Sequence, residues 1–246
     1  MEHRFRPVFN ALQGAALAAE VRLPSQKEID RRYKNIRARM QSAGLDALIV
    51  CGNQYAGFEG AVFYTSGFEI VHRYVYVLIP LEGEPTLVFP REARWIGDKK
   101  KPWVKDQVWP DIPGVWLRDR ATECKWKMIG TYGMNFVMAV RDYRELAQAP
   151  FELVPFDQEF DMARAVKSGE ELAEVRDAMD IIVDGFWALV AAYQPGKTEA
   201  EIMAPAVERF FCARRGSAHD EHSPVRRERR GQCVLQSARP AQGCAW

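Results

Sequence analysis

The stretch that decides the fold is residues 25–51, SQKEIDRRYKNIRARMQSAGLDALIVC. It begins with the capping box Ser25-Gln26-Lys27-Glu28, which predicts a helix start, and Gly44 is placed to end that helix. Between them, apolar residues recur at steps of four, three and four, the spacing of one helix face: Ile29, Tyr33, Ile36 and Met40. The apolar run Leu45–Cys51 follows at once and predicts a buried strand. A helix leading directly into a buried strand indicates an α/β domain.

Two further capping boxes predict helices in the second half of the chain. Ser168–Glu171 opens the first, and Thr198–Glu201 opens the second after a Pro-Gly turn at residues 195–196. The first of these helices carries a continuous apolar stripe: Leu172, Val175, Met179, Ile182, Phe186 and Leu189. Pro205 lies inside the second, so we expect a kink or an early helix end there.

Four segments between the first helix and residue 160 predict strands. Tyr74–Ile79 and Pro85–Phe89 flank a glycine turn at residues 82–84 and predict a β-hairpin. Met128–Gly130 and Phe151–Phe156 predict two more strands. Residues 91–125 show no clear period and are expected to form loops. The pattern as a whole predicts an α/β fold with a mixed sheet.

Composition narrows the class of protein. The chain has 246 residues, of which 48% are hydrophobic and 27% charged, as in globular proteins. Its net charge of +1 gives no electrostatic argument for a nucleic acid, membrane or acidic partner. The five cysteines form no C-x-x-C pair, which favours free thiols in a reducing compartment, and we expect a cytoplasmic protein. No apolar run reaches transmembrane length.

The two ends of the chain differ in character from the rest. Residues 8–19 follow Arg4 and Arg6 and weakly resemble a secretion signal, but polar residues interrupt the apolar stretch. A surface arm over residues 1–24 is therefore expected. Residues 217–246 have no apolar period, and disorder is the expectation. A basic arm that binds phosphate is the alternative, which three acidic residues in the same stretch oppose.

Five motifs, in order, carry a resemblance to a known family. They are Gly44–Val50 (G-x-D-A-L-x-V), Tyr64–Phe68 (Y-x-[ST]-G-F), the hairpin turn Gly83-Glu84-Pro85, Arg164–Leu172 (R-x-I-K-S-x-x-E-I) and Pro195–Glu199 (P-G-x-T-E). Together they resemble the creatinase / Xaa-Pro aminopeptidase / prolidase family, whose catalytic domain has the pita-bread fold. Residues 91–125 and 217–246 lie outside the match. The helix that such domains place before Met128 looks short here.

The resemblance implies a domain organisation. Residues 1–24 form an arm, 25–160 a creatinase-like amino-terminal domain, 161–216 the first helices of a pita-bread domain, and 217–246 an unrelated or disordered tail. We expect the helices of 161–216 to expose an apolar stripe, so that the chain aggregates or associates through it. The resemblance also implies a homo-oligomer assembled through the amino-terminal domain.

The implied activity is that of a metal-dependent hydrolase acting on a peptide or small C–N substrate. In the family two Asp, one His and two Glu hold two divalent ions, such as Mn, Co or Zn, which activate a bridging water. These ligands lie beyond the Pro-Gly-x-Thr-Glu turn, and residues 200–246 contain no such series. No catalytic residue or metal ligand can therefore be carried over, and we expect the chain to be inactive alone.

Three hypotheses for the chain follow. A reading-frame slip or premature end at about residues 217–225 would make it a truncated hydrolase, because the composition changes abruptly there. Alternatively it is a non-catalytic binding or oligomerisation module. The third possibility is a truncation product without function.

His72 and Arg73 are the candidate substrate-binding residues. The resemblance implies that their loop reaches the active site of a neighbouring subunit, where an arginine grips a substrate carboxylate through its bidentate fork. The alternative is a solvated charge at the start of a strand. His219 and His222 could bind a metal ion, but a flexible polar tail is expected there. Four tryptophans could line a pocket, but packing is expected: Trp95, Trp103, Trp109 and Trp116.

Overall fold

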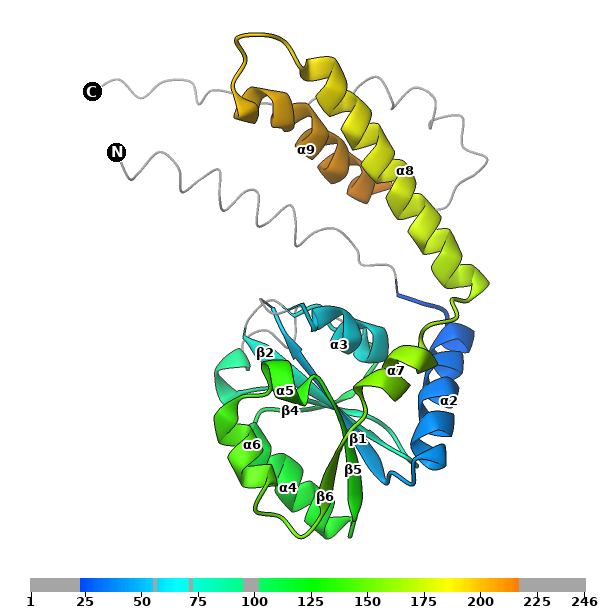
Figure 1. The fold of residues 1–246 in the computed structure, drawn as a ribbon, viewed down its shortest axis with the longest axis vertical. Helices are drawn as coiled ribbons and strands as arrows, with labels where there is room; N and C mark the ends of the chain where they lie inside the picture. The colour runs from blue at the N-terminus through cyan, green and yellow to red at the C-terminus, as the bar shows by residue number, and fades with distance from the viewer. Residues whose placement is uncertain (1–22, 55–56, 71–72, 95–101, 217–246) are drawn as a thin grey trace, which may run out of the picture. The chain divides into compact units, whose positions relative to one another are not determined.

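The computed structural model describes residues 23–54, 57–70, 73–94 and 102–216 (Figure 1). The chain divides into two compact units. The amino-terminal unit runs from Arg22 to Glu171, and the residues from Leu172 onward belong to the other, here called the helical unit. The predicted tail, and residues 1–22 of the predicted surface arm, lie outside the described residues.

The described residues of the amino-terminal unit form a sheet, six α-helices and the first residues of a seventh, α8. Its helices are α2 (Gln26–Ser42), α3 (Glu59–Ser66), α4 (Pro113–Glu123), α5 (Met134–Val137), α6 (Val140–Leu146) and α7 (Asp157–Ala163), with a 3-10 turn η1 (Arg91–Ala93), and α8 (Gly169–Ala192) begins at its end. Its strands are β1 (Ala47–Asn53), β2 (Tyr74–Pro80), β3 (Thr86–Val88), β4 (Asp106–Val108), β5 (Met128–Tyr132) and β6 (Glu152–Pro155).

The six strands form one mixed sheet in the order β4-β3-β2-β1-β5-β6. β1 pairs antiparallel with β2, Ala47 opposite Pro80, and parallel with β5, Ala47 opposite Ile129. The predicted hairpin is present as the antiparallel pair β2–β3. The predicted α/β fold with a mixed sheet is thus confirmed, and the two strands expected near residues 128 and 152 are β5 and β6.

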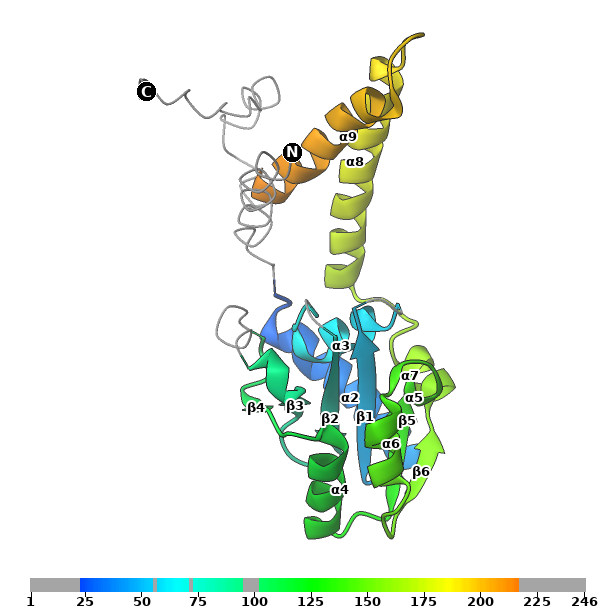
Figure 2. The ribbon, with the colours of Figure 1, turned by 90° about the vertical axis from the view of Figure 1, so that its left-hand side faces the viewer.

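Helices cover both faces of this sheet (Figures 1 and 2). Leu48 and Val50 of β1 face a core completed by α2, α3 and α7, whereas Ala47, Ile49 and Cys51 face a second core completed by α4, α5 and α6. Because side chains on both faces of β1 are buried, the strand does not alternate between apolar and polar residues. This explains the unbroken apolar run in the sequence.

Helix α2 starts and ends as its sequence predicts. Ser25 Oγ accepts from Glu28 N at 3.2 Å. At the other end, Leu45 N donates to Met40 O at 2.9 Å and Gly44 N to Gln41 O at 3.1 Å, which is a Schellman motif. β1 begins two residues after Leu45, the last residue of this motif. The C-cap of α2 therefore fixes where the central strand begins.

Asp46 explains the acidic position in the motif before β1. Its carboxylate accepts from Lys127 N at 2.6 Å and Met128 N at 3.0 Å, and its own N–H donates to Met128 O. The side chain therefore ties the start of β1 to the start of β5. This role is structural, since both bonds go to backbone amides of the neighbouring strand.

The expectation of loops over residues 91–125 is wrong. That span contains η1, β4 and the eleven-residue helix α4, so the helix before Met128 is present as well. No side chain of the preceding residue caps α4; instead Asp142 Oδ1, on α6, accepts from Gly114 N at 3.0 Å. A cap supplied from 28 residues away leaves no local signal, which is why the pattern failed.

The motif Tyr64–Phe68 forms the end of a helix. Tyr64, Thr65 and Ser66 are the last residues of α3, and Gly67 caps it in the left-handed conformation at φ 71°. Ser66 Oγ accepts from Phe68 N at 3.1 Å. Helix α3 has only eight residues and little amphipathic pattern, so no local signal predicts it.

The described part of the helical unit consists of α8 from Leu172 onward and α9 (Glu199–Gly216). Both predicted capping boxes are formed: Ser168 with Glu171, and Thr198 with Glu201. Helix α9 continues through Pro205, so the early end considered for it does not occur. Gly185 of α8 is buried where α9 packs, and a Cβ there would lie 2.2 Å from the Phe210 ring.

Candidate functional site

Arg73 lies directly before β2, as its position in the sequence predicts, while His72 lies outside the described residues. Arg73 has a positive φ of 54°, unusual for a side chain of this size, and its carbonyl accepts from Gln54 N at 3.0 Å. That hydrogen bond connects the end of β1 to the start of β2. It fixes the backbone at Arg73, while the Arg73 side chain remains exposed.

The Arg73 guanidinium is half-exposed and pairs with Glu92 at 2.5 Å. Both partners are more than two-fifths exposed, so the pair contributes little to stability. Chemically, the group offers five N–H donors in a planar fork and suits a carboxylate or phosphate. Its ion-pair partner among the described residues is the Glu92 carboxylate, and the exposed guanidinium can hold an anion.

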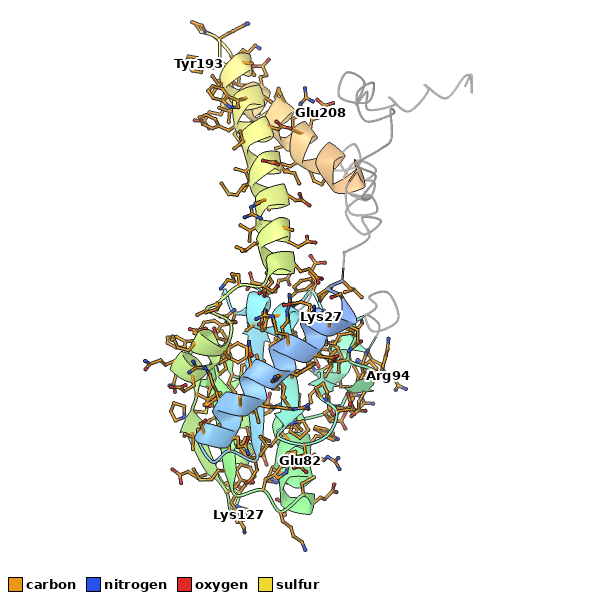
Figure 3. All side chains as sticks on the ribbon, turned by 90° about the vertical axis from the view of Figure 1, so that its right-hand side faces the viewer. Lys27, Glu82, Arg94, Lys127, Tyr193 and Glu208 are labelled. Carbon is orange, nitrogen blue, oxygen red and sulfur yellow. The ribbon has the colours of Figure 1, made fainter. Side chains whose placement is uncertain are left out.

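A groove of about 670 Å³ lies elsewhere on the same unit, between α2 and the edge of the sheet. Figure 3 views the unit from the α2 side, with Lys27 labelled in the first turn of that helix. The α2 wall consists of residues at helical spacing: Gln26, Ile29, Asp30, Tyr33, Lys34 and Arg37. The opposite wall comes from the chain around β3 and β4: Glu84, Pro85, Trp103, Val104, Lys105 and Asp106.

Charges of both signs alternate around two aromatic rings in this groove. Tyr33 Oη donates to Thr65 O and accepts from Trp103 Nε1 at 3.3 Å. Burial raises the Tyr33 pKa to about 12, so its hydroxyl stays protonated at neutral pH. The lining residues that the structure describes include no His, Ser, Thr or Cys. They can therefore bind a ligand carrying both charges, but they include no nucleophile activated by a base.

Sequence reasoning missed this groove because the polar residues of α2 resemble a solvated helix face. Trp103 was expected to be a packing residue. It lines the groove and also packs against Gly67, where a Cβ would lie 2.5 Å from the Trp103 ring. Trp109 stacks on Phe89 at 5.5 Å, and Trp116 packs against the second core, as expected of packing residues. Trp95 lies outside the described residues.

A buried charge network occupies the start of α2. Glu28 is 4% exposed and bonds Arg31 at 2.9 Å and Arg32 at 2.8 Å. Burial opposes its ionisation, but hydrogen bonds from Arg31, Arg32 and Ser168 outweigh this and lower the Glu28 pKa to about 2. Arg31 also bonds Glu171 at 2.6 Å. Every charge has a partner within the unit, so the network stabilises the fold.

The first residues of α8, Glu170 and Glu171, complete that network and have a structural role. Glu170 accepts from both the N–H and the hydroxyl of Ser25, each at 2.7 Å. It thus takes the place that Glu28 would have in a self-contained capping box, because Glu28 is committed to Arg31 and Arg32.

A second buried carboxylate, Asp142, is also fully used by the fold. Besides capping α4 it accepts from Tyr76 Oη at 2.9 Å, and burial together with this carboxylate raises the Tyr76 pKa well above its usual value. Cys51 lies on the same face, and burial raises its thiol pKa, which makes it unreactive. Neither residue reaches solvent.

Metal binding finds no support in the part of the chain that the structure describes. No group of three or more His, Cys, Asp or Glu side chains there is arranged to hold an ion. The described residues therefore do not fit the two-metal centre that the family implies. His219 and His222 lie outside them. None of the described helices has the length and apolar character needed to cross a membrane.

The comparison with protein families decides the classification. Residues 32–166, more than half of the chain, match the model of the Creatinase/Prolidase N-terminal domain. The chain belongs to this family. A comparison with curated protein sequences finds no significant match.

Solved structures agree in fold. The X-Pro aminopeptidase from Thermotoga maritima MSB8 superposes with a TM-score of 0.61 at 18% identity, covering 74% of this chain and 49% of that one. Dipeptidase PepE from Mycobacterium ulcerans gives 0.58 at 20% identity, with 75% and 49% covered. The Xaa-Pro dipeptidase from Bacillus anthracis gives 0.57 at 16% identity, with the same coverage. The chain thus spans about half the length of each of these three proteins.

Proposed function

We propose that this chain carries the amino-terminal domain of a metal-dependent hydrolase of the Xaa-Pro peptidase or creatinase type, and that it does not hydrolyse such substrates alone. The family match over residues 32–166 carries the first part. The second part is supported by the absence, among the described residues, of a metal-ligand group. The two divalent ions of the family, Mn, Co or Zn, would then be held by other residues.

The test is an assay of the purified full chain on an Xaa-Pro dipeptide with added Mn²⁺, Co²⁺ or Zn²⁺, with and without a chelator. We expect no hydrolysis above the metal-only blank. The Thermotoga aminopeptidase, at equal concentration, serves as the positive control. Chelator-sensitive hydrolysis that co-elutes with the chain in gel filtration would contradict the proposal.

Substrate contact by His72 and Arg73 is part of the proposal. The support is that Arg73 presents a half-exposed guanidinium from a fixed backbone position. Titration calorimetry of an Xaa-Pro dipeptide against the chain and its Arg73→Ala variant tests this, with the dipeptide amide as the matched ligand that lacks a carboxylate. We expect the variant to bind the free acid more weakly and the amide unchanged; equal binding of the acid would refute the contact.

We further propose a cytoplasmic homo-oligomer that associates through the amino-terminal unit. Three apolar side chains on α5 and α6 are exposed there and form the surface to test: Phe136, Val140 and Tyr143. Phe136 also stacks on Phe58 with ring centroids 5.3 Å apart, which holds it in place. Phe136→Glu should lower the mass of the assembly in sedimentation experiments.

The second candidate function is a non-catalytic binding module, which the groove beside α2 favours. Its mixed charges suit a zwitterionic peptide, with Lys34 and Asp30 on one wall. Lys34→Glu should abolish binding of such a peptide, whereas Lys27→Glu, on α2 but outside the lining, should not. Binding that is unaffected by Lys34→Glu would remove this candidate.

A further inference from the structure

An ion pair occupies the group that we propose as the contact for a substrate carboxylate. Arg73 Nη1 donates to Glu92 Oε1, with the two atoms 2.5 Å apart. The Arg73 side chain is 57% exposed and that of Glu92 is 43% exposed, so a ligand from solvent can reach both. A ligand carboxylate is chemically the same group as the Glu92 carboxylate, and both bind a guanidinium through N–H···O hydrogen bonds. The two therefore compete for one site.

The backbone at Arg73 is held in a conformation that is unusual for a side chain of this size. Its φ of 54° lies in the left-handed region, which is strained for residues other than glycine. The hydrogen bond from Gln54 N to its carbonyl, at 3.0 Å, fixes this conformation. Strain that the surrounding structure maintains is concentrated at functional sites. The guanidinium thus starts from a fixed position.

Glu92 is fixed as well, because it lies in the 3-10 turn η1. Ala93 N donates to Pro90 O at 2.8 Å, which closes the turn. Ala93 is 1% exposed and anchors the turn in the core that α2, α3 and α7 complete. Figure 3 labels Arg94, the residue directly after η1. The Glu92 carboxylate is therefore held beside Arg73 at a constant effective concentration.

The arginines around Glu92 are engaged with a different residue. Arg91, which precedes Glu92, pairs with Asp111 at 2.5 Å, and Arg141 Nη2 donates to the Asp111 carbonyl at 3.2 Å. The ion-pair partner of Glu92 among the described residues is accordingly Arg73. Removing the charge of Glu92 should act on Arg73 first.

The pair is weaker than the contact that a ligand can make. Its hydrogen bond joins one guanidinium nitrogen to one carboxylate oxygen. A free carboxylate can instead bind the planar fork of arginine through two parallel hydrogen bonds. Ion pairs between side chains this exposed are weak, so Glu92 lowers the fraction of Arg73 that is open without abolishing it. The apparent affinity for a ligand falls by that fraction.

We propose that Glu92 is an internal competitor for the Arg73 guanidinium, which a ligand carboxylate must displace in order to bind there. The inference rests on the substrate contact proposed for Arg73 above. A negatively charged group that binds both prongs of the guanidinium displaces Glu92, whereas a neutral amide leaves the pair intact. Glu92 thereby sets both the affinity of this contact and its preference for a free carboxyl terminus.

An NMR titration of the full chain with the dipeptide alanyl-proline, followed at the backbone amides around Arg73, tests the competition. The variants are Glu92→Gln, Arg73→Ala and the two combined. Glu82→Gln is the matched control, because Glu82 carries the same charge at an exposed turn. We expect Glu92→Gln to bind the dipeptide about two- to fivefold more tightly, the range that an exposed ion pair allows, and Glu82→Gln to bind it as wild type does. The C-terminal amide of the dipeptide should bind to Glu92→Gln no more tightly than to wild type.

The combined variant distinguishes failure of this inference from failure of the substrate contact. A gain from Glu92→Gln that disappears when Arg73 is replaced by alanine supports the competition. A gain that persists there reflects only the general effect of the removed charge and overturns it, as does an equal gain for the amide. Binding that needs Arg73 but is unchanged by Glu92→Gln overturns the competition and leaves the substrate contact standing. Dipeptide binding that is absent, or that Arg73→Ala does not weaken, refutes the substrate contact and the competition with it.

Discussion

At the residue scale, the Glu28 carboxylate is the centre of the buried charge network in the amino-terminal unit. Its pKa of about 2 lies below the ordinary value of 4.5, so the folded state favours the ionised form. A depressed carboxylate pKa contributes stability that is fully present above 4.5 and is lost as the pH falls from 4.5 towards 2. The shift corresponds to at most about 3 kcal/mol.

Glu28→Gln should therefore lower the free energy of unfolding by about 2–3 kcal/mol at neutral pH and flatten its pH dependence between pH 4.5 and 2. Urea unfolding at a series of pH values measures both effects. Glu82→Gln, at an exposed turn, is the control and should leave both unchanged. Parallel pH profiles for wild type and Glu28→Gln would contradict the assignment.

Gly114 is required by the close approach of α4 and α6. A Cβ at this position would lie 2.4 Å from both the Cα and the carbonyl oxygen of Asp142, which are backbone atoms and cannot rotate away. Gly114→Ala should destabilise the unit by about 1–3 kcal/mol. Gly60→Ala, within α3 and with open space around its Cβ, should be neutral or stabilise by up to about 1 kcal/mol. Thermal unfolding of the two variants makes the comparison.

At the element scale, Pro205 lies within α9 and removes one helical hydrogen bond. Pro205→Ala should increase the stability of the helical unit, by up to about 3 kcal/mol, and raise its amide protection in hydrogen exchange. Pro113→Ala is the matched control, because Pro113 occupies the first turn of α4, where proline is well tolerated. Unchanged protection of α9 in Pro205→Ala would show that the proline is accommodated without cost.

The elements that could be predicted are those whose signals are local. α8 and α9 carry their own capping boxes, α2 carries its own N-cap serine, and β1 and β2 carry apolar runs or alternation. α4 could not be predicted, because its cap is the distant Asp142, and α3 is short and held by tertiary contacts. Of the candidate site, the position of Arg73 could be predicted, but its pairing with Glu92 and the groove beside α2 depend on packing between segments far apart in the sequence.

At the scale of the whole molecule, the division into two units predicts two unfolding transitions. Glu28→Gln should move only the transition of the amino-terminal unit, and Pro205→Ala only that of the helical unit. Chemical denaturation followed separately by tryptophan fluorescence and by circular dichroism resolves them. A single transition that both variants shift would show that the units unfold together.

The contact between Ser25 and Glu170 also has a consequence for synthesis on the ribosome. The two residues are separated by 145 positions, so the group that completes the first helix is made almost last in its unit. At translation rates of about 5–20 residues per second, the start of α2 waits roughly 7–30 s for its partner. During that time the apolar face of α2 has no finished sheet to cover it, and the nascent chain is then most exposed to chaperones and to misfolding.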